Sequence, residues 1–402
     1  MPHTRRLALV LSLVSFVAFS SWELLRPART PLMDLSNTFS DHFSHMNAGR
    51  LFLRVGLDVW RKPLVEMLPP PTPQQAANLP PVARWCRDCA FIVPGWEKPV
   101  LQSWPTVVRF YPPGDMVLTA PIAALYHFTD LSATDANRLL LVLILACAHL
   151  GLFLLLDGLF AAPDGLRWHA LLPGFYGVTV VLHWSLEGFY DVSMVAPLLL
   201  CWRWLGQRRG LAAAVAFCAA AFLHFRAYYY APWFLAAIVL IVRERQWRTW
   251  ARRDVAALGA GALMGAASLG SYLLAVPGLL SFSTYPSPLF IGHGHFDGEA
   301  LGMAALVTLL AIAAFALSHS LLDALLVPWI ALILITVRQT MPWYMVAVVP
   351  WLCAVPRPGK AERAPLVLDA RLLLFLFLAA VVHPDQRIGT DLMPTWLAKL
   401  FA

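Results

Sequence analysis

The stretch that decides the fold is Leu139–Phe160, which reads LLLVLILACAHLGLFLLLDGLF. It contains one carboxylate, Asp157, and one histidine, His149, among otherwise apolar residues. As a helix it would be about 33 Å long at about 1.5 Å per residue, enough to cross a hydrocarbon core of about 30 Å. Because lipid offers the backbone no hydrogen-bond partners, a crossing segment must satisfy its own polar groups, as a helix does. The stretch therefore predicts a transmembrane helix.

The whole chain has the composition of a membrane protein. Of its 402 residues, 59% are hydrophobic and 13% are charged, and the mean hydropathy is +0.65. Soluble domains have about 25% charged residues. The net charge of +7 comes mostly from arginines between apolar runs, where it indicates orientation and gives no reason to expect a nucleic-acid partner. We expect a single integral membrane domain over residues 1–402, with an all-α polytopic fold.

Apolar runs long enough to cross a bilayer recur along the chain. They predict about eleven transmembrane helices, in a range of roughly 10 to 13 because several runs are short. The runs cover residues 7–25, 139–160, 169–185, 187–204, 210–225, 228–242, 254–277, 300–317, 321–338, 342–356 and 367–383.

Basic residues between these runs predict the orientation, since positively charged loops stay in the cytoplasm. The clusters are Arg5/Arg6, Arg167, Arg203/Arg208/Arg209, Arg243–Arg253 and Arg357–Arg363. They place the amino terminus inside and the polar segment 26–113 outside, which means the periplasm for a bacterial cytoplasmic (inner) membrane. No small-x-small cleavage site follows the first run, so we expect an uncleaved anchor and not a cleaved signal peptide.

The apolar stretch 116–128 does not fit this topology as a crossing. It has only about 13 residues, which is short for a span. A crossing here would also move Arg167 and Arg203 to the wrong side. We expect an interfacial or re-entrant helix. The alternative is that the stretch crosses and that residues 160–168 lie outside.

An amphipathic helix is expected in the large outer loop, over residues 35–60. Its apolar residues recur every three to four positions, which is typical of a helix with one apolar face, and we expect that face to lie on the bilayer. Asp34 or Ser36 would cap the helix, whereas Asp41 sits in its body with His45 one turn later. A carboxylate there would suit general-base catalysis. The alternative is a solvated polar face made of Asp41, His42, Arg50, Arg54 and Asp58.

The same loop contains Cys86 and Cys89 in the sequence Cys-Arg-Asp-Cys. A second pair of ligands at zinc-site spacing is absent nearby. Because an extracytoplasmic compartment is oxidising, a local disulfide is favoured over a metal or redox centre.

Three short motifs resemble those of the GT-C superfamily of polytopic glycosyltransferases, which use polyprenyl-phosphate sugars. The motifs are Asp41-x3-His45-x2-Ala48, Gly56-x3-Trp60, and Tyr111-Pro112-Pro113 before an apolar helix. The resemblance implies inverting transfer of a sugar from the lipid-linked donor to a hydroxyl of a glycan, lipid or protein acceptor. It also implies that Asp41 is the base that deprotonates this hydroxyl.

The chain departs from the family pattern in several places. Trp60 replaces the usual tyrosine, Gly114-Asp115 replaces apolar residues, and the insert 62–108 is longer than expected. Some members of the family have two adjacent carboxylates, whereas here only Asp34 would accompany Asp41.

Further candidates lie at the outer ends of predicted spans. A lipid phosphate needs a cation near the membrane surface, and arginine offers a two-pronged donor. The candidates for binding the donor phosphate are Arg226, Arg338, His224 and Tyr111. The acidic candidates for an auxiliary or acceptor-binding role are Asp34, Glu187 and Asp191. The simpler interpretation of such residues is that they anchor span ends at the interface.

No cofactor is expected, and a divalent metal is left open. His293 and His295, with Asp297 and Glu299 nearby, are weak candidates for metal ligands, because a glycine-rich loop carries them.

Two other functions are left open: a transporter or flippase for lipid-linked saccharides, and a polymerase or ligase of surface polysaccharide. Neither explains so large a first loop.

Overall fold

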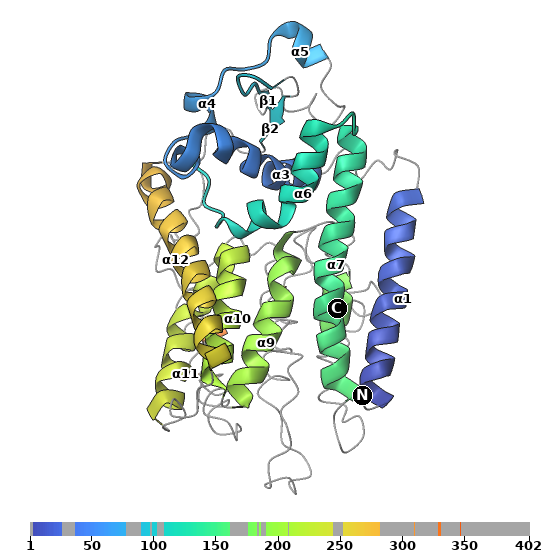
Figure 1. Cartoon of the computed structure of the whole chain (residues 1–402), viewed down its shortest axis with the longest axis vertical. Coiled ribbons are helices and arrows are strands. Elements are labelled where there is room, and N and C mark those ends of the chain that lie inside the picture. Colours follow the sequence, from blue (N-terminus) through green and yellow to red (C-terminus); the bar gives the residue numbers. More distant parts are fainter. Residues whose placement is uncertain are drawn as a thin grey trace, which may run out of the picture.

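The computed structural model describes residues 3–25, 37–77, 90–96, 99–102, 108–160, 176–182, 185, 190–207, 209–243, 252–281, 309, 329–330 and 346. These residues form a bundle of long helices with a smaller layer on one end, which we call the loop layer (Figure 1). The bundle contains α1 (His3–Leu25), α7 (Ala133–Phe160), α9 (Val195–Gly206), α10 (Gly210–Leu223), α11 (Ala231–Arg243) and α12 (Arg252–Ser281). The loop layer contains α3 (Asn37–Val55), η1 (Gly56–Trp60), α4 (Leu64–Met67), α5 (Pro73–Ala77), β1 (Ala90–Phe91), β2 (Val100–Leu101) and α6 (Gly114–Phe128).

The bundle confirms the predicted helical membrane fold in its coarse form. Three described helices contain segments long and apolar enough to cross a membrane: His3–Leu25, Thr134–Phe160 and Ala256–Ala275. The decisive stretch 139–160 lies within the second of them. The count of eleven crossings stays a prediction, because most of the chain after Ser281 lies outside the described residues.

At one end of the bundle, the carboxylate of Asp157 near the end of α7 links three helices through ion pairs. Its oxygens lie 4.0 Å from Nε of Arg5 and 2.9 Å from Nη1 of Arg203. The start of α1 and the ends of α7 and α9 therefore meet at one end, opposite the loop layer (Figure 1). The sequence placed these arginines on one side of the membrane for a different reason, the charge rule.

The predicted interfacial helix begins at Asn37 and is α-helical to Val55. It ends at Gly56, whose φ of +57° is a left-handed conformation that favours glycine, and the 3-10 helix η1 follows. The expected contact of its apolar face with the bilayer is wrong for Met46, Leu51 and Val59, which are buried inside the loop layer, whereas Phe52 of the same face is exposed.

The alternative, a solvated polar face, is wrong for Arg50, whereas Arg54 is exposed, as that alternative requires. Arg50 is buried between the rings of Trp96 and Tyr126, with Cζ 4.4 Å and 5.3 Å from their centroids. Its Nη1 donates to Oδ1 of Asn47 at 2.9 Å. Arg50 therefore packs within the protein, whereas Leu53, three residues later on the same helix, is exposed.

The stretch 116–128 belongs to α6, which begins at Gly114 directly after Tyr111-Pro112-Pro113. It packs beside α3, where Thr119 Oγ1 donates to the carbonyl of His45 at 3.2 Å. A turn then leads into α7, whose start is capped by Ser132: the backbone N–H of Asp135 donates to its hydroxyl at 3.0 Å. The helix lies in the loop layer (Figure 1), and its interfacial or re-entrant position in a membrane stays a prediction.

The all-α prediction missed one element. Strands β1 and β2 pair antiparallel, with Ala90 opposite Leu101 and Phe91 opposite Val100. The turn between them uses Gly95 at φ +84°. All four strand residues are buried, and β2 packs against α3.

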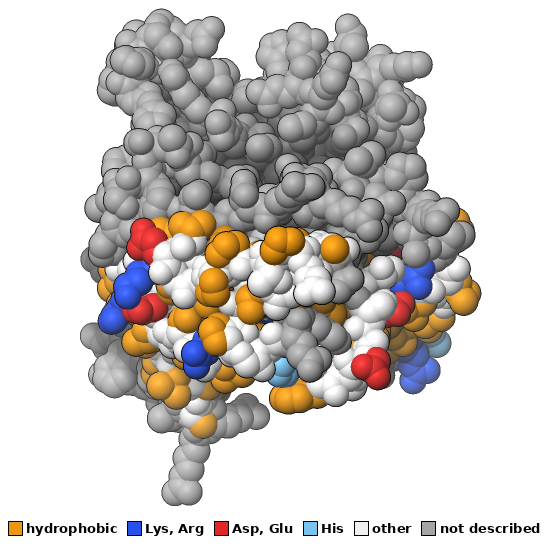
Figure 2. Space-filling model, turned by 90° about the horizontal axis from the view of Figure 1, so that it is seen from above, with side chains coloured by type: hydrophobic (Ala, Val, Ile, Leu, Met, Phe, Trp, Pro, Cys, Tyr) orange, Lys and Arg blue, Asp and Glu red, His pale blue; other side chains and the backbone are white. Residues whose placement is uncertain are grey.

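The loop layer also exposes apolar side chains. Seen from above, hydrophobic residues cover much of its described face, and charged ones gather near the edges (Figure 2). The large exposed side chains in this layer include Leu53, Leu57, Val65 and Phe128. Large exposed apolar residues mark surfaces that meet lipid or a partner. These residues, together with Phe52 of α3, form the exposed apolar surface of the described loop layer.

Candidate functional site

A charged cluster lies inside the loop layer, where α3 and α6 meet. The Asp115 carboxylate at the start of α6 accepts from Nδ1 of His45 at 2.7 Å and from the Arg109 guanidinium. Its other oxygen accepts the backbone N–H of Met116 at 2.7 Å. His45 therefore presents a protonated Nδ1 to the carboxylate. We call His45, Arg109 and Asp115 the loop-layer cluster.

A second cluster of the same composition lies at the adjoining end of the bundle. Asp191 belongs to the 3-10 helix η4 (Tyr190–Met194), and His224 and Arg226 flank the start of η5 (Phe225–Tyr230). The Arg226 guanidinium forms an ion pair with Asp191, and His224 Nε2 lies 3.4 Å from the same carboxylate. The backbone N–H of Arg226 donates to His224 Nδ1 at 3.3 Å, so a neutral His224 carries its proton on Nε2, toward Asp191. We call Asp191, His224 and Arg226 the bundle cluster.

Two tyrosines join the clusters. The ring of Tyr190 stacks on His45, with centroids 4.5 Å apart and planes at 23°, and faces His224 at 6.3 Å and 28°. Tyr111 meets both imidazoles edge-on, at 4.5 Å from His45 and 5.3 Å from His224. The two clusters and the two tyrosines form one connected unit, which we call the polar junction.

The polar junction is buried and electrically balanced. The six ionisable residues of the two clusters are all buried. Burial lowers the pKa of Arg109 to about 10, partly offset by Tyr111 and Tyr190, so its guanidinium stays protonated at neutral pH. Two carboxylates thus face two guanidiniums, and these four charges balance. Buried charges need this balance, because an unpaired one costs several kcal/mol.

Glycine at position 114 lets the loop layer meet the bundle closely. A Cβ there would collide with the carbonyl carbon and oxygen of Phe222, near the end of α10. Asp115 follows directly, so this close approach brings the two clusters together. Gly114-Asp115, a departure from the GT-C pattern, is thus part of the polar junction.

Four of the residues predicted from the sequence meet in the polar junction. They are Tyr111, Asp191, His224 and Arg226. Asp191, His224 and Arg226 form an ionic network, and the ring of Tyr111 packs edge-on against His224. Their roles in binding a donor or acceptor remain predictions.

The other predicted site residues lie outside what the structure describes. Asp41 lies in the body of α3, as expected, but its side chain is outside the described set. The remaining ones are Asp34, Cys86, Cys89, Glu187 and Arg338. The potential metal ligands His293 and His295 lie there too.

Sequence reasoning missed Arg109, Asp115 and Tyr190 as members of this site. One signal was available: Arg109 and Asp115 flank the Tyr-Pro-Pro motif, and charged residues beside apolar helices are seldom placed without a partner. The pairing of Asp115 with His45 was not visible in the sequence, because these two residues are 70 positions apart.

Among the described residues, no group of three or more His, Cys, Asp or Glu side chains could hold a metal ion. Each cluster contains one carboxylate and one imidazole, and in both clusters the carboxylate forms an ion pair with an arginine. Within this part of the chain the polar groups are arranged for ion pairing.

Comparison with known proteins gives no further guidance. The chain matches no protein family, no curated protein and no solved structure.

Proposed function

We propose that this protein is a membrane glycosyltransferase that moves a sugar from a polyprenyl-phosphate donor to an acceptor hydroxyl, with inversion, at the face of the membrane covered by the loop layer. The motifs shared with the GT-C superfamily support this proposal. It is also supported by the loop layer set on a helical bundle, with ionisable residues gathered between the two.

The observation that carries the proposal is the position of α3. His45 on α3 is buried in the polar junction against Asp115 and Tyr190. Asp41 precedes His45 by one helical turn of α3. His45 lies where the loop layer meets the bundle, and we place the arrival of the lipid-linked substrate at this boundary.

The chemistry assigned to Asp41 is general-base catalysis. The carboxylate takes the proton of the acceptor hydroxyl as its oxygen attacks the anomeric carbon. The bond from that carbon to the phosphate oxygen breaks on the opposite face of the sugar, and polyprenyl phosphate leaves with the bonding electron pair. The configuration at the anomeric carbon is therefore inverted.

The leaving phosphate requires a cation, and we assign this role to Arg226. In the described state Arg226 is paired with Asp191. Phosphate would compete with Asp191 for the guanidinium, which offers a charge-assisted, two-pronged contact. The carboxylate of Asp191 would then keep His224 as its partner, since His224 Nε2 lies 3.4 Å from it.

The proposal is tested with the full-length protein in proteoliposomes. The donors are polyprenyl phosphates carrying glucose, mannose, galactose or arabinose, the acceptors are extracted membrane lipids and glycans, and released polyprenyl phosphate is measured by mass spectrometry. We expect one donor to be consumed. Asp41→Asn should lower turnover by about 100- to 10,000-fold, the usual contribution of a general base, while the protein stays folded.

The matched control is Asp130→Asn, because Asp130 is an exposed carboxylate in the turn between α6 and α7. It should keep wild-type turnover. An Asp41→Asn protein with wild-type turnover would exclude Asp41 as the base. If no donor is cleaved but lipid-linked sugars cross the bilayer, the protein is a carrier and not a transferase.

A further inference from the structure

The exposed face of α6 is entirely apolar. The structure describes this helix in full, and its exposed residues are Val117, Ala120, Pro121, Ala124, Leu125 and Phe128. The three largest of them, Val117, Leu125 and Phe128, are 63%, 48% and 81% exposed. A helix that faces water on one side carries polar residues on that side. The face of α6 lacks such residues, and it therefore marks a surface that meets lipid or a partner.

The ends of α7 and α9 provide a scale for the depth of α6. At the end of the bundle opposite the loop layer, Asp157 pairs with Arg203 at 2.9 Å, and each residue lies three positions before the end of its helix. From this common level, α7 has 28 residues and α9 has 12. At about 1.5 Å per residue, α7 extends roughly 24 Å farther than α9. The loop layer lies above α9 and beside this outer part of α7 (Figure 1).

The middle of α6 lies at the outer boundary of the hydrocarbon core. Asp157 marks the inner boundary, because charged residues at span ends lie at the interface. A core of about 30 Å corresponds to roughly 20 residues of helix, so the outer boundary falls between Ala136 and Leu140 of α7. These two residues form one buried cluster with Ile122 and Tyr126 of α6.

The start of α6 lies deeper than its middle. A Cβ at Gly114 would collide with the backbone of Phe222, which lies twelve residues after the start of α10. Since α10 begins just after α9 ends, Phe222 is about 18 Å from the inner end of the bundle. This is well short of a core of about 30 Å, so the first turn of α6 lies within its outer half. Both ends of α6 are therefore on the outer side, and the helix does not cross.

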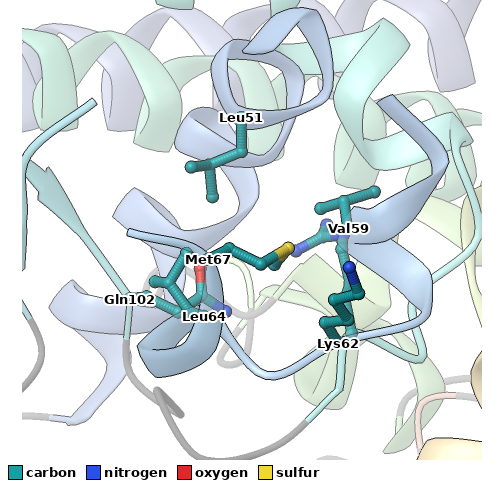
Figure 3. Close-up of a pocket in the computed structure, with 7 residues that line it drawn as sticks. Leu51, Val59, Lys62, Leu64, Met67 and Gln102 are labelled. Atoms are coloured by element: carbon teal, nitrogen blue, oxygen red, sulfur yellow. The ribbon is translucent and has the colours of Figure 1, made fainter. Parts of the chain in front are cut away.

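The described part of the loop layer is closely packed inside. Its cavity between α3 and α4 has a volume of about 20 Å³, which is room for a water-sized molecule. Leu51 points into this cavity from α3, and Met67 reaches across it toward Val59 (Figure 3). A hydrocarbon chain has no room there, so lipid contacts this part of the protein on its outer surface.

We infer that α6 is a re-entrant helix whose exposed face lies against the acyl chains of the outer leaflet. Hydrocarbon requires apolar side chains, and this face has no others. The deep end of the face, at Val117, is two residues along the chain from Asp115, so membrane lipid lies beside the polar junction. The inference does not depend on the proposed reaction.

The inference is tested by spin labelling of the full-length protein in vesicles of phosphatidylethanolamine and phosphatidylglycerol. In a cysteine-free background, Val117→Cys and Leu125→Cys each carry one nitroxide. Its collisions are measured with oxygen, which concentrates in hydrocarbon, and with a nickel chelate, which stays in water. We expect collisions with oxygen to dominate at Val117→Cys. The ratio of oxygen to nickel collisions should fall at Leu125→Cys, which lies about 12 Å farther along the helix.

Two control positions define the range of this ratio. Val14 is exposed in the middle of the predicted span of α1, and Gln74 is exposed on α5 in the loop layer. Val14→Cys should favour oxygen, whereas Gln74→Cys should favour nickel. If Val117→Cys does not fold, Ala120→Cys replaces it, because Ala120 is exposed about one turn later on the same face.

Three results would overturn the inference. A ratio at Val117→Cys close to that of Gln74→Cys would place the face in water. Exclusion of both reagents would show that protein covers the face. Equal ratios at Val117→Cys and Leu125→Cys would mean that α6 lies flat on the membrane and does not re-enter it. None of these measurements involves turnover, so the transferase proposal stands or falls separately.

Discussion

Replacement of Asp115 by asparagine should strongly destabilise the protein. The side chain is fully buried and accepts from His45, from Arg109 and from the backbone of Met116. Asp115→Asn keeps the volume but removes the charge that balances Arg109. The variant therefore leaves a guanidinium buried without a counter-ion.

The expected magnitude follows from the burial of both partners. Removing one member of a buried ion pair costs about 3 to 5 kcal/mol, because the other charge remains desolvated. Asparagine still accepts the N–H of Met116, so we expect the lower end, about 3 kcal/mol. Removing both charges should be less harmful than the sum of the single changes. For Asp115→Asn with Arg109→Met, we expect a coupling of about 2 kcal/mol.

The assay is the free energy of unfolding in mixed micelles, measured by SDS titration for the wild type, the two single variants and the double variant. Asp58→Asn is the control, because its pair with Lys62 is partly exposed and should change stability by no more than about 0.5 kcal/mol. The reasoning is refuted if Asp115→Asn is as stable as this control, or if the effects of the two single variants simply add.

Two further predictions concern the junction and the topology. Gly114→Ala should destabilise the protein by about 1 to 3 kcal/mol, because its Cβ would collide with the backbone of Phe222; the same SDS titration checks this, and wild-type stability would contradict the close approach. In a cysteine-free background, Asp130→Cys should react with an impermeant maleimide in intact cells. Gln207→Cys, which is exposed at the opposite end of the bundle, should react only after lysis. The reverse pattern would invert the proposed orientation.

Much of the secondary structure was predictable from the sequence. The runs 7–25, 139–160 and 254–277 lie in α1, α7 and α12, and the short stretch 116–128 lies in α6. These predictions succeed because hydropathy and helical period depend on residues close together in the chain. The ends were less accurate, and α7 begins six residues before the predicted run, because Ser132 caps it.

The side on which a helix is buried was not predictable in the same way. The pattern of α3 indicated an apolar face for lipid, yet Met46 and Leu51 pack inside the loop layer. Arg50, assigned to a solvated face as the alternative, is buried between two aromatic rings. An amphipathic period shows that a helix has an apolar face but not what covers that face.

The sequence by itself determined that this is a helical membrane protein, that polar residues gather toward one end of its helices, and that Asp41 lies within a helix of the first loop. Only the tertiary structure decided which charges are partners. Asp115 pairs with His45 and Arg109, and Asp191 pairs with Arg226. Composition and periodicity are local properties of the chain, whereas ion pairing depends on distances between segments that come together only when the loop layer packs onto the bundle.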